Sequence, residues 1–222
     1  MARLSYPAPG QPRPAALPPE RRTVGQLVAE SINAYGGRFF PSLALGIGPA
    51  LIAVVTVHVS RTVWLILAPT VVAAILSVSF TGAAVLVLKR RPPWRQLAVA
   101  WGCGWLVLAP LPFLVLAFVL PGLAWLAAFG LVVPVVVVED LAPRAALARA
   151  WRLARADYVH ALGSLATLAI VVFLTQAVLA FLLRGVGGAA VWTAYVLANM
   201  VVSPLLFLGT ALLYVDQSAR VK

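Results

Sequence analysis

The sequence TVWLILAPTVVAAILSVSFTGAAVLVLKRRPPWR, residues 62–95, decides the fold. Residues 62–88 contain no Asp, Glu, Lys or Arg, whereas Lys89, Arg90, Arg91 and Arg95 follow at once. A helix rises about 1.5 Å per residue, so about 20 apolar residues cross the hydrocarbon core of a bilayer. Residues 62–88 are long enough to span a membrane, and the basic group marks the end of that span.

The composition of the whole chain agrees with this prediction. Of 222 residues, 63% are hydrophobic and 10% are charged. Soluble domains are about half apolar and about a quarter charged, because much of their surface must face water. A bilayer removes that requirement, so we expect an integral membrane protein.

Four more windows lack charged residues, namely 39–60, 96–138, 158–183 and 185–215. Residues 96–138 are too many for one helix and suit two, with a turn near Leu120-Pro121-Gly122, where proline and glycine break helices. The sequence therefore predicts an all-α, polytopic helical bundle. Its six transmembrane helices are expected at 41–59, 63–88, 97–119, 122–138, 159–183 and 189–215.

Positive charges predict the orientation of the bundle, because cytoplasmic segments are rich in Lys and Arg. With six spans and a cytoplasmic N-terminus, only Arg61 and Arg184 fall outside. All six acidic residues fall inside, and the inside basic residues are Arg3, Arg13, Arg21, Arg22, Arg38, Lys89, Arg90, Arg91, Arg95, Arg144, Arg149, Arg152, Arg155, Arg220 and Lys222. Both termini are thus predicted to be cytoplasmic.

Two amphipathic helices are expected on the cytoplasmic face, at about 23–38 and 143–157. Thr23 and Gln26 form a capping-box pattern at the start of the first. In the second, apolar side chains occupy one arc and arginines the neighbouring arc. Such a helix should lie along the inner leaflet, so its candidate lipid or partner contacts are Arg144, Arg149, Trp151, Arg152 and Arg155.

The domain organisation is predicted to be simple. Residues 1–22 are rich in proline and lack the apolar core of a signal peptide, which predicts a disordered cytoplasmic tail. Residues 23–216 form the membrane domain, and residues 217–222 form a short cytoplasmic tail.

No catalytic motif, cofactor-binding motif or metal-ligand spacing is present, so we expect no enzyme activity, no cofactor and no metal. His58 and His160 lie near span ends on opposite sides, and the single Cys103 cannot complete a zinc site.

The formal net charge of +11 could suggest nucleic acid, but these charges sit in short clusters between apolar runs. An anionic leaflet is the simpler partner, and no nucleic acid is expected.

Four polar side chains near or within the spans are singled out. Glu139 and Asp140 end the fourth span beside the arginine helix, where Glu139 could pair with Arg149 or Arg152. A headgroup phosphate site is the alternative. Gln176 and Asn199 fall at comparable depths in the last two spans, so an interhelical hydrogen bond is expected, with a polar lining for a substrate path as the alternative.

The segment 133–155, VPVVVVEDLAPRAALARAWRLAR, resembles the signature of a bacterial membrane-domain family. That family is named for the membrane domain of glycerophosphoryl diester phosphodiesterase. Residues 23–27 and 35–39 are similar to its opening helix, but Ala150 stands where the family commonly has serine. Nothing here resembles the soluble phosphodiesterase domain, so the resemblance implies a bacterial plasma-membrane location and no enzymatic activity.

These features favour a non-catalytic membrane module that engages anionic lipid or a protein partner through its Arg/Trp helix. A transporter or permease subunit for a lipid-like or small solute is the alternative. A cavity reaching Gln176 and Asn199 would favour the alternative, and a tightly packed interior would not. Assembly with a second copy of the chain is left open.

Overall fold

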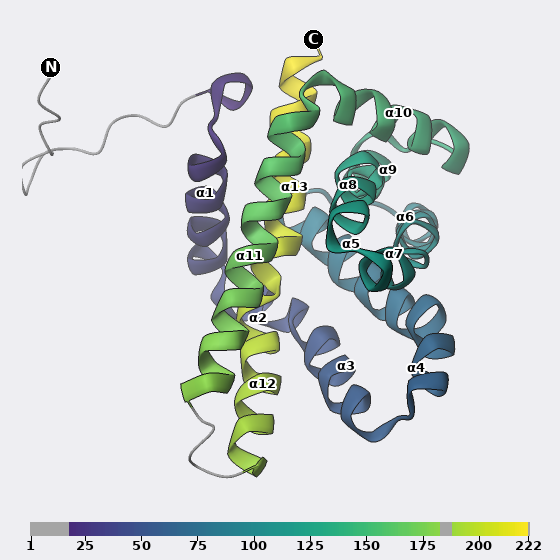
Figure 1. The fold of residues 1–222 in the computed structure, drawn as a ribbon. Coiled ribbons are helices and arrows are strands. Elements are labelled where there is room, and N and C mark those ends of the chain that lie inside the picture. The colour runs from purple at the N-terminus through teal and green to yellow at the C-terminus, as the bar shows by residue number, and fades with distance from the viewer. Residues whose placement is uncertain (1–17, 183–187, 222) are drawn as a thin grey trace, which may run out of the picture.

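The computed structural model describes residues 18–182 and 188–221 and shows an all-α bundle (Figure 1). Six of its helical segments are long and apolar enough to cross a membrane. They are Phe39–Thr56, Arg61–Leu88, Trp94–Ala117, Val119–Glu139, Tyr158–Leu179 and Val191–Arg220. The predicted all-α, six-span architecture is therefore confirmed, and the chain is a multi-pass membrane protein.

Five of the six spans are broken into shorter helices. The first comprises α2 (Phe39–Leu45) and α3 (Ile47–His58), the third α6 (Trp94–Leu108) and α7 (Leu111–Ala117), the fourth α8 (Val119–Phe129) and α9 (Val132–Glu139), and the sixth α12 (Gly188–Val202) and α13 (Pro204–Arg220). The second contains α4 (Arg61–Leu67), a π-helical turn (Ala68–Val72) and α5 (Ala73–Leu88). Only the fifth, α11 (Tyr158–Leu182), is continuous.

Proline and glycine account for the positions of the breaks. Pro110 and Pro204 stand at or just before the first residue of a new helix, where a missing backbone N–H costs little. Gly46 and Gly130 separate the halves of the first and fourth spans. Neighbouring helices can satisfy the backbone groups that such breaks release within a membrane.

The break between α12 and α13 also explains a close helix contact. Because Pro204 lacks an N–H, it cannot bond to the carbonyl of Met200 four residues earlier. A Cβ atom built on Gly46 would lie 1.8 Å from that carbonyl oxygen. Only glycine therefore lets the first span approach the sixth this closely.

The turn between the third and fourth spans differs from the prediction. It lies at Phe118, which adopts an extended conformation, and not at Leu120-Pro121-Gly122. Pro121 and Gly122 belong to the start of α8, because the first turn of a helix tolerates proline. The predicted turn position was wrong by two to four residues.

The helix predicted at residues 23–38 forms as α1 (Val24–Gly37), with Thr23 and Gln26 making the capping box. It lies alongside the upper parts of α11 and α13 (Figure 1) and buries Leu27 and Ser31 completely. This amphipathic helix is therefore packed on the bundle through one face, while Ile32 is exposed.

The boundaries of the predicted membrane domain were too narrow. Residues Pro19–Arg21 form a 3-10 turn, and Arg22 contacts Asp216. At the other end, α13 continues to Arg220 and buries Gln217. Residues 18–22 and 217–220 are thus part of the folded bundle, whereas the rest of the predicted N-terminal tail and Lys222 lie outside the described residues.

Candidate functional site

The arginine helix α10 (Pro143–Ala156) lies across one end of α8 and α9 and leads into α11 (Figure 1). Ala146, Ala150, Leu153 and Ala154 are buried against the bundle. The small alanine side chains let α10 pack closely, which leaves its long side chains at the edges. Arg144, Arg152 and Arg155 are exposed.

The fourth arginine of α10 is used within the protein. Arg149 Nε donates to both carboxylate oxygens of Glu139, at 3.2 and 3.1 Å. The hydroxyl of Tyr214 on α13 donates to the same carboxylate at 3.1 Å. Glu139 therefore ties α9, α10 and α13 together, and Arg149 rather than Arg152 is its partner.

Asp140 does not join this cluster. It ends α9 in the left-handed conformation, with φ of 48° and ψ of 43°, and it is exposed. Asp tolerates this conformation better than most residues. No ion pair joins Asp140 to any residue in the described part of the chain, so of the two carboxylates only Glu139 takes part in an ion pair.

Trp151 is both a packing residue and a support for an arginine. Its ring stacks on Phe129 of α8 with centroids 5.6 Å apart. The guanidinium of Arg155 lies 4.6 Å from the Trp151 ring centroid, within the range of a cation–π contact. Trp151 is 36% exposed, so its outer part remains available to a ligand.

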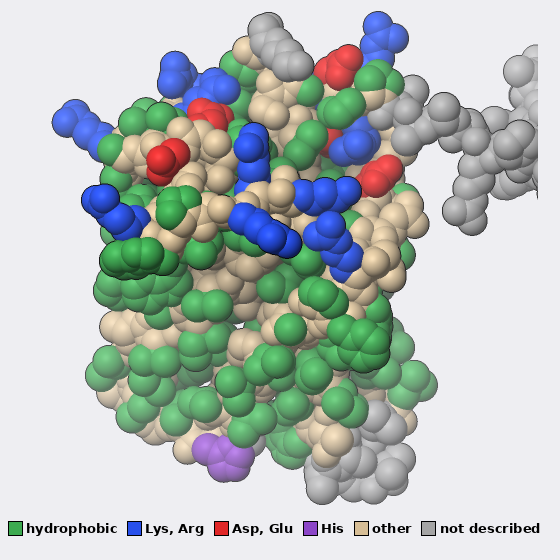
Figure 2. Space-filling model, turned by 180° about the vertical axis from the view of Figure 1, so that it is seen from behind, with side chains coloured by type: hydrophobic (Ala, Val, Ile, Leu, Met, Phe, Trp, Pro, Cys, Tyr) green, Lys and Arg blue, Asp and Glu red, His purple; other side chains and the backbone are tan. Residues whose placement is uncertain are grey.

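Exposed basic side chains from two segments make up what we call the basic surface: Lys89, Arg90, Arg91, Arg95, Arg144, Arg152 and Arg155. Trp94, which lies between Arg91 and Arg95 in the first segment, is 76% exposed. On the face drawn in Figure 2, charged side chains occupy the upper part of the molecule and the lower part is hydrophobic. Charge is therefore concentrated toward one end of the bundle.

An apolar groove of about 610 Å³ begins at α10. Leu147 of α10 lines it together with Trp125 and Phe129 of α8, and the groove continues along α6 and α7 to Pro69. The indole of Trp125 donates to the carbonyl of Val107 at 2.8 Å, which hides the polar atom of that ring from the groove. The groove is suited to an alkyl chain.

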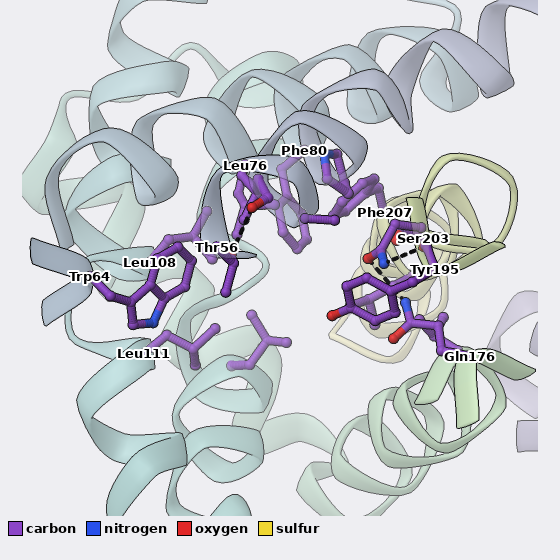
Figure 3. Close-up of a pocket in the computed structure, with 17 residues that line it drawn as sticks. Thr56, Trp64, Leu76, Phe80, Leu108, Leu111, Gln176, Tyr195, Ser203 and Phe207 are labelled. Atoms are coloured by element: carbon purple, nitrogen blue, oxygen red, sulfur yellow. Dashed lines mark hydrogen bonds between the residues drawn. The ribbon is translucent and has the colours of Figure 1, made fainter. Parts of the chain in front are cut away.

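A second cavity, of about 330 Å³, lies where all six spans meet (Figure 3). We call it the polar cavity, because Thr56, Gln176, Tyr195, Asn199 and Ser203 line it among apolar side chains. Its apolar lining is Pro49, Ile52, Ala53, Trp64, Leu76, Phe80, Leu108, Leu111, Leu126, Val172, Leu206 and Phe207.

Gln176 and Asn199 meet in this cavity. Gln176 Nε2 donates to Asn199 Oδ1 at 3.0 Å, and Asn199 Nδ2 donates to the Tyr195 carbonyl at 2.9 Å. The predicted interhelical hydrogen bond therefore forms between α11 and α12. The same two side chains also line the polar cavity, so the two alternatives raised by the sequence are compatible.

Sequence reasoning missed a partly buried cluster at the charged end, which we call the terminal cluster: Arg22, Asp157, His160, Asp216, Gln217 and Arg220. Arg22 Nη1 lies 2.5 Å from Asp216 Oδ1, and Asp216 is fully buried. Arg220 pairs with Asp157, and Gln217 donates to the Asp157 carbonyl at 2.9 Å. The spacing of Asp216 and Arg220, one turn apart at the end of the last span, was the only available signal.

His160 also belongs to the terminal cluster and is not a plain interfacial residue. Its Nε2 lies 3.8 Å from Asp216 Oδ2, and its side chain is 9% exposed. Neither atom has a hydrogen-bond partner among the described residues. Over that same part of the chain, no group of three His, Cys, Asp or Glu side chains could hold a metal ion.

Comparisons with known proteins add no assignment. No family model, no curated protein and no solved structure matches the chain. Function must therefore be inferred from the basic surface, the groove and the polar cavity themselves.

Proposed function

We propose that the protein is a non-catalytic membrane module that binds anionic phospholipid of the inner leaflet, with both termini in the cytoplasm. One observation carries this proposal: the apolar groove and the basic surface meet on α10. Leu147 lines the groove, and Arg144, three residues earlier, lies on the same side of the helix. An anionic phospholipid needs both an apolar groove for an acyl chain and a cationic site next to it for the headgroup.

The charges on α10 support an anionic rather than a neutral headgroup. Glu139 neutralises Arg149, but Arg144, Arg152 and Arg155 are exposed. A guanidinium can hold phosphate through two parallel hydrogen bonds. Each basic residue near an anionic membrane surface contributes about 1 kcal/mol, or roughly a fivefold gain in affinity.

The proposal can be tested by counting retained lipids. The protein is placed in nanodiscs of equal phosphatidylglycerol and phosphatidylcholine, released, and examined by native mass spectrometry. Changing Arg144, Arg152 and Arg155 together to Gln should reduce retained phosphatidylglycerol at least tenfold without changing phosphatidylcholine. Equal retention of phosphatidylglycerol by the variant and the parent protein would refute lipid binding by α10.

Two controls separate charge from folding. Arg61→Gln removes one basic residue at the opposite end of the second span and should leave phosphatidylglycerol retention unchanged. Arg149→Gln breaks the pair with Glu139, so it should lower the melting temperature more than it lowers lipid retention. If Arg149→Gln alone abolished retention, the lipid would be bound at the Glu139 cluster and not at the exposed arginines.

A second function, a transporter or permease subunit for a lipid-like or small solute, is favoured by the polar cavity. The cavity reaches Gln176 and Asn199 and receives side chains from all six spans. Proteoliposomes containing the protein should then accelerate exchange of a fluorescent neutral lipid between leaflets. Exchange no faster than in protein-free liposomes would argue against this function.

A further inference from the structure

The polar cavity has features of a ligand site that are separate from the basic surface. Its volume of about 330 Å³ falls at the lower end of the range of about 300–1,000 Å³ found for ligand pockets. Its lining mixes a large apolar wall with five polar residues. Side chains that served only to pack the six spans together would leave less empty space, since protein interiors contain few voids of this size.

Two hydroxyl groups on the cavity wall lack partners. Ser203 is 8% exposed, yet no described residue is hydrogen-bonded to its hydroxyl. Elsewhere in the bundle, hydroxyls such as those of Thr167 and Thr210 donate to the carbonyl four residues back, whereas those of Ser42 and Ser164 also have no partner among the described residues. The Tyr195 hydroxyl points into the cavity (Figure 3) and likewise has no hydrogen-bond partner in the described part of the chain.

The charge of the lining limits the ligand. None of the residues that line the cavity is Asp, Glu, Lys, Arg or His. A charged ligand would leave its charge without a counter-charge inside the membrane, at a high desolvation cost. The head of the ligand must therefore be uncharged and able to hydrogen-bond.

The volume of the cavity and the position of its rim limit the size of the ligand. A water-sized group occupies about 30 Å³ in a liquid, so the cavity holds a small head and the first few carbons of a chain. Thr56, which is exposed, lies on the rim. A longer chain would leave the cavity there and continue into the bilayer.

We propose that the polar cavity binds a single-chain amphiphile with an uncharged, hydroxyl-bearing head, of the monoacylglycerol type. Ser203, Tyr195 and the Gln176–Asn199 pair hydrogen-bond the head, while Phe80 and Leu126 contact the chain. This site does not depend on lipid binding by α10. A monoacylglycerol would also be a suitable ligand for the proposed transport function, but the site requires only that this ligand bind, not that it be transported.

Photolabelling tests the proposal in nanodiscs that contain the full chain. The probe is a monoacylglycerol with a diazirine near its head, and its comparison is a lysophosphatidic acid with the same chain and diazirine. Monoacylglycerol should label peptides of α3, α11 or α12 that line the cavity, and excess unlabelled monoacylglycerol should abolish this labelling. Lysophosphatidic acid should label the same peptides at least tenfold less.

Variants assign the labelling to the cavity. Ala53→Phe fills the space beside the 4% exposed Ala53 and should reduce labelling at least fivefold. Leu197→Phe places the same phenyl side chain on α12 at a 53% exposed position outside the cavity lining, so it should have no effect. Tyr195→Phe removes one hydroxyl without a change of volume and should reduce labelling about threefold.

Three results would overturn the proposal. They are labelling that unlabelled monoacylglycerol does not compete, equal labelling by lysophosphatidic acid, and full labelling of both the Tyr195→Phe protein and a folded Ala53→Phe protein. Phosphatidylglycerol retention, measured on the same variants, should stay at the parent level. Reduced monoacylglycerol labelling with unchanged phosphatidylglycerol retention therefore shows that the polar cavity and α10 are separate sites, so that failure of one proposal can be told from failure of the other.

Discussion

Asp216 is the side chain on which the charged end of the bundle most depends. It is fully buried and bonded to Arg22, 194 residues away in the sequence. It is also 3.8 Å from His160. The N-terminal turn, α11 and α13 all contribute to the terminal cluster, so this contact joins the two ends of the described chain.

Changing Asp216 to Asn should destabilise the protein strongly. The substitution keeps the shape but leaves the Arg22 guanidinium, whose side chain is 12% exposed, without a counter-charge. Removing one partner of a buried ion pair costs about 3–5 kcal/mol. Intrinsic-fluorescence melting in detergent should therefore show a lower melting temperature for Asp216→Asn.

Asp140→Asn is the matched control for this substitution. Asp140 is exposed, has no ion pair in the described part of the chain, and has a positive φ that Asn also accepts. Its melting temperature should equal that of the parent. If both substitutions melted alike, Asp216 would not be a structural anchor.

Sequence reasoning identified residues well where the contact was local. Glu139 and Arg149 are ten residues apart at a helix end, so their pairing could be anticipated from helix geometry alone. Arg22 was expected in the N-terminal tail, and Asp216 was expected as the last residue of the membrane domain at the other end of the chain. Nothing in the residues themselves shows that the two segments fold against one another.

Helix breaks determine how the spans approach each other. Windows without charge predicted the number of spans, because the cost of burying charge in lipid is large and easily recognised. They could not predict the π-helical turn (Ala68–Val72) or the packing of α1, because these depend on tertiary contacts. The polar cavity was unpredictable for the same reason, since it is the space left between six kinked helices.

Gly46→Ala tests the closest of these helix contacts. The added methyl group would meet the Met200 carbonyl, which belongs to the backbone and cannot rotate away. Overpacking commonly costs about 1–3 kcal/mol, and a backbone contact should place this variant at or above the upper limit. Size-exclusion chromatography in detergent should show less monodisperse protein, and melting should occur at lower temperature.

Gly102→Ala provides the comparison within another span. A Cβ atom at Gly102 of α6 meets nothing within 4 Å. Alanine also has the higher helix propensity, by about 1 kcal/mol. This variant should be as stable as the parent or slightly more so. Similar loss of monodispersity in both glycine variants would contradict a specific contact between Gly46 and Met200.

The whole molecule has two ends of different character. Residues at or near the predicted cytoplasmic ends of the spans contact one another at one end: Arg38 Nη1 donates to the carbonyl of Leu86 at 2.6 Å, and Gln96 Nε2 donates to that of Val136 at 2.8 Å. The basic surface and the terminal cluster belong to that end. Thr56, Trp64 and Tyr195 of the polar cavity come from helix portions nearer the opposite turns. The two proposed lipid sites would therefore serve opposite leaflets.

Cysteine labelling tests this orientation directly. In a Cys103→Ala background, Arg91→Cys marks the basic turn and Ser60→Cys marks the turn between the first two spans. A membrane-impermeant maleimide added to intact cells should label Ser60→Cys only, and Arg91→Cys should react only after the cells are permeabilised. The reason is that seven exposed Lys and Arg residues form the basic surface, and retaining them on the cytoplasmic side is strongly favoured during insertion. Labelling of Arg91→Cys in intact cells would invert the bundle, place the arginine helix outside, and remove the basis for inner-leaflet lipid binding.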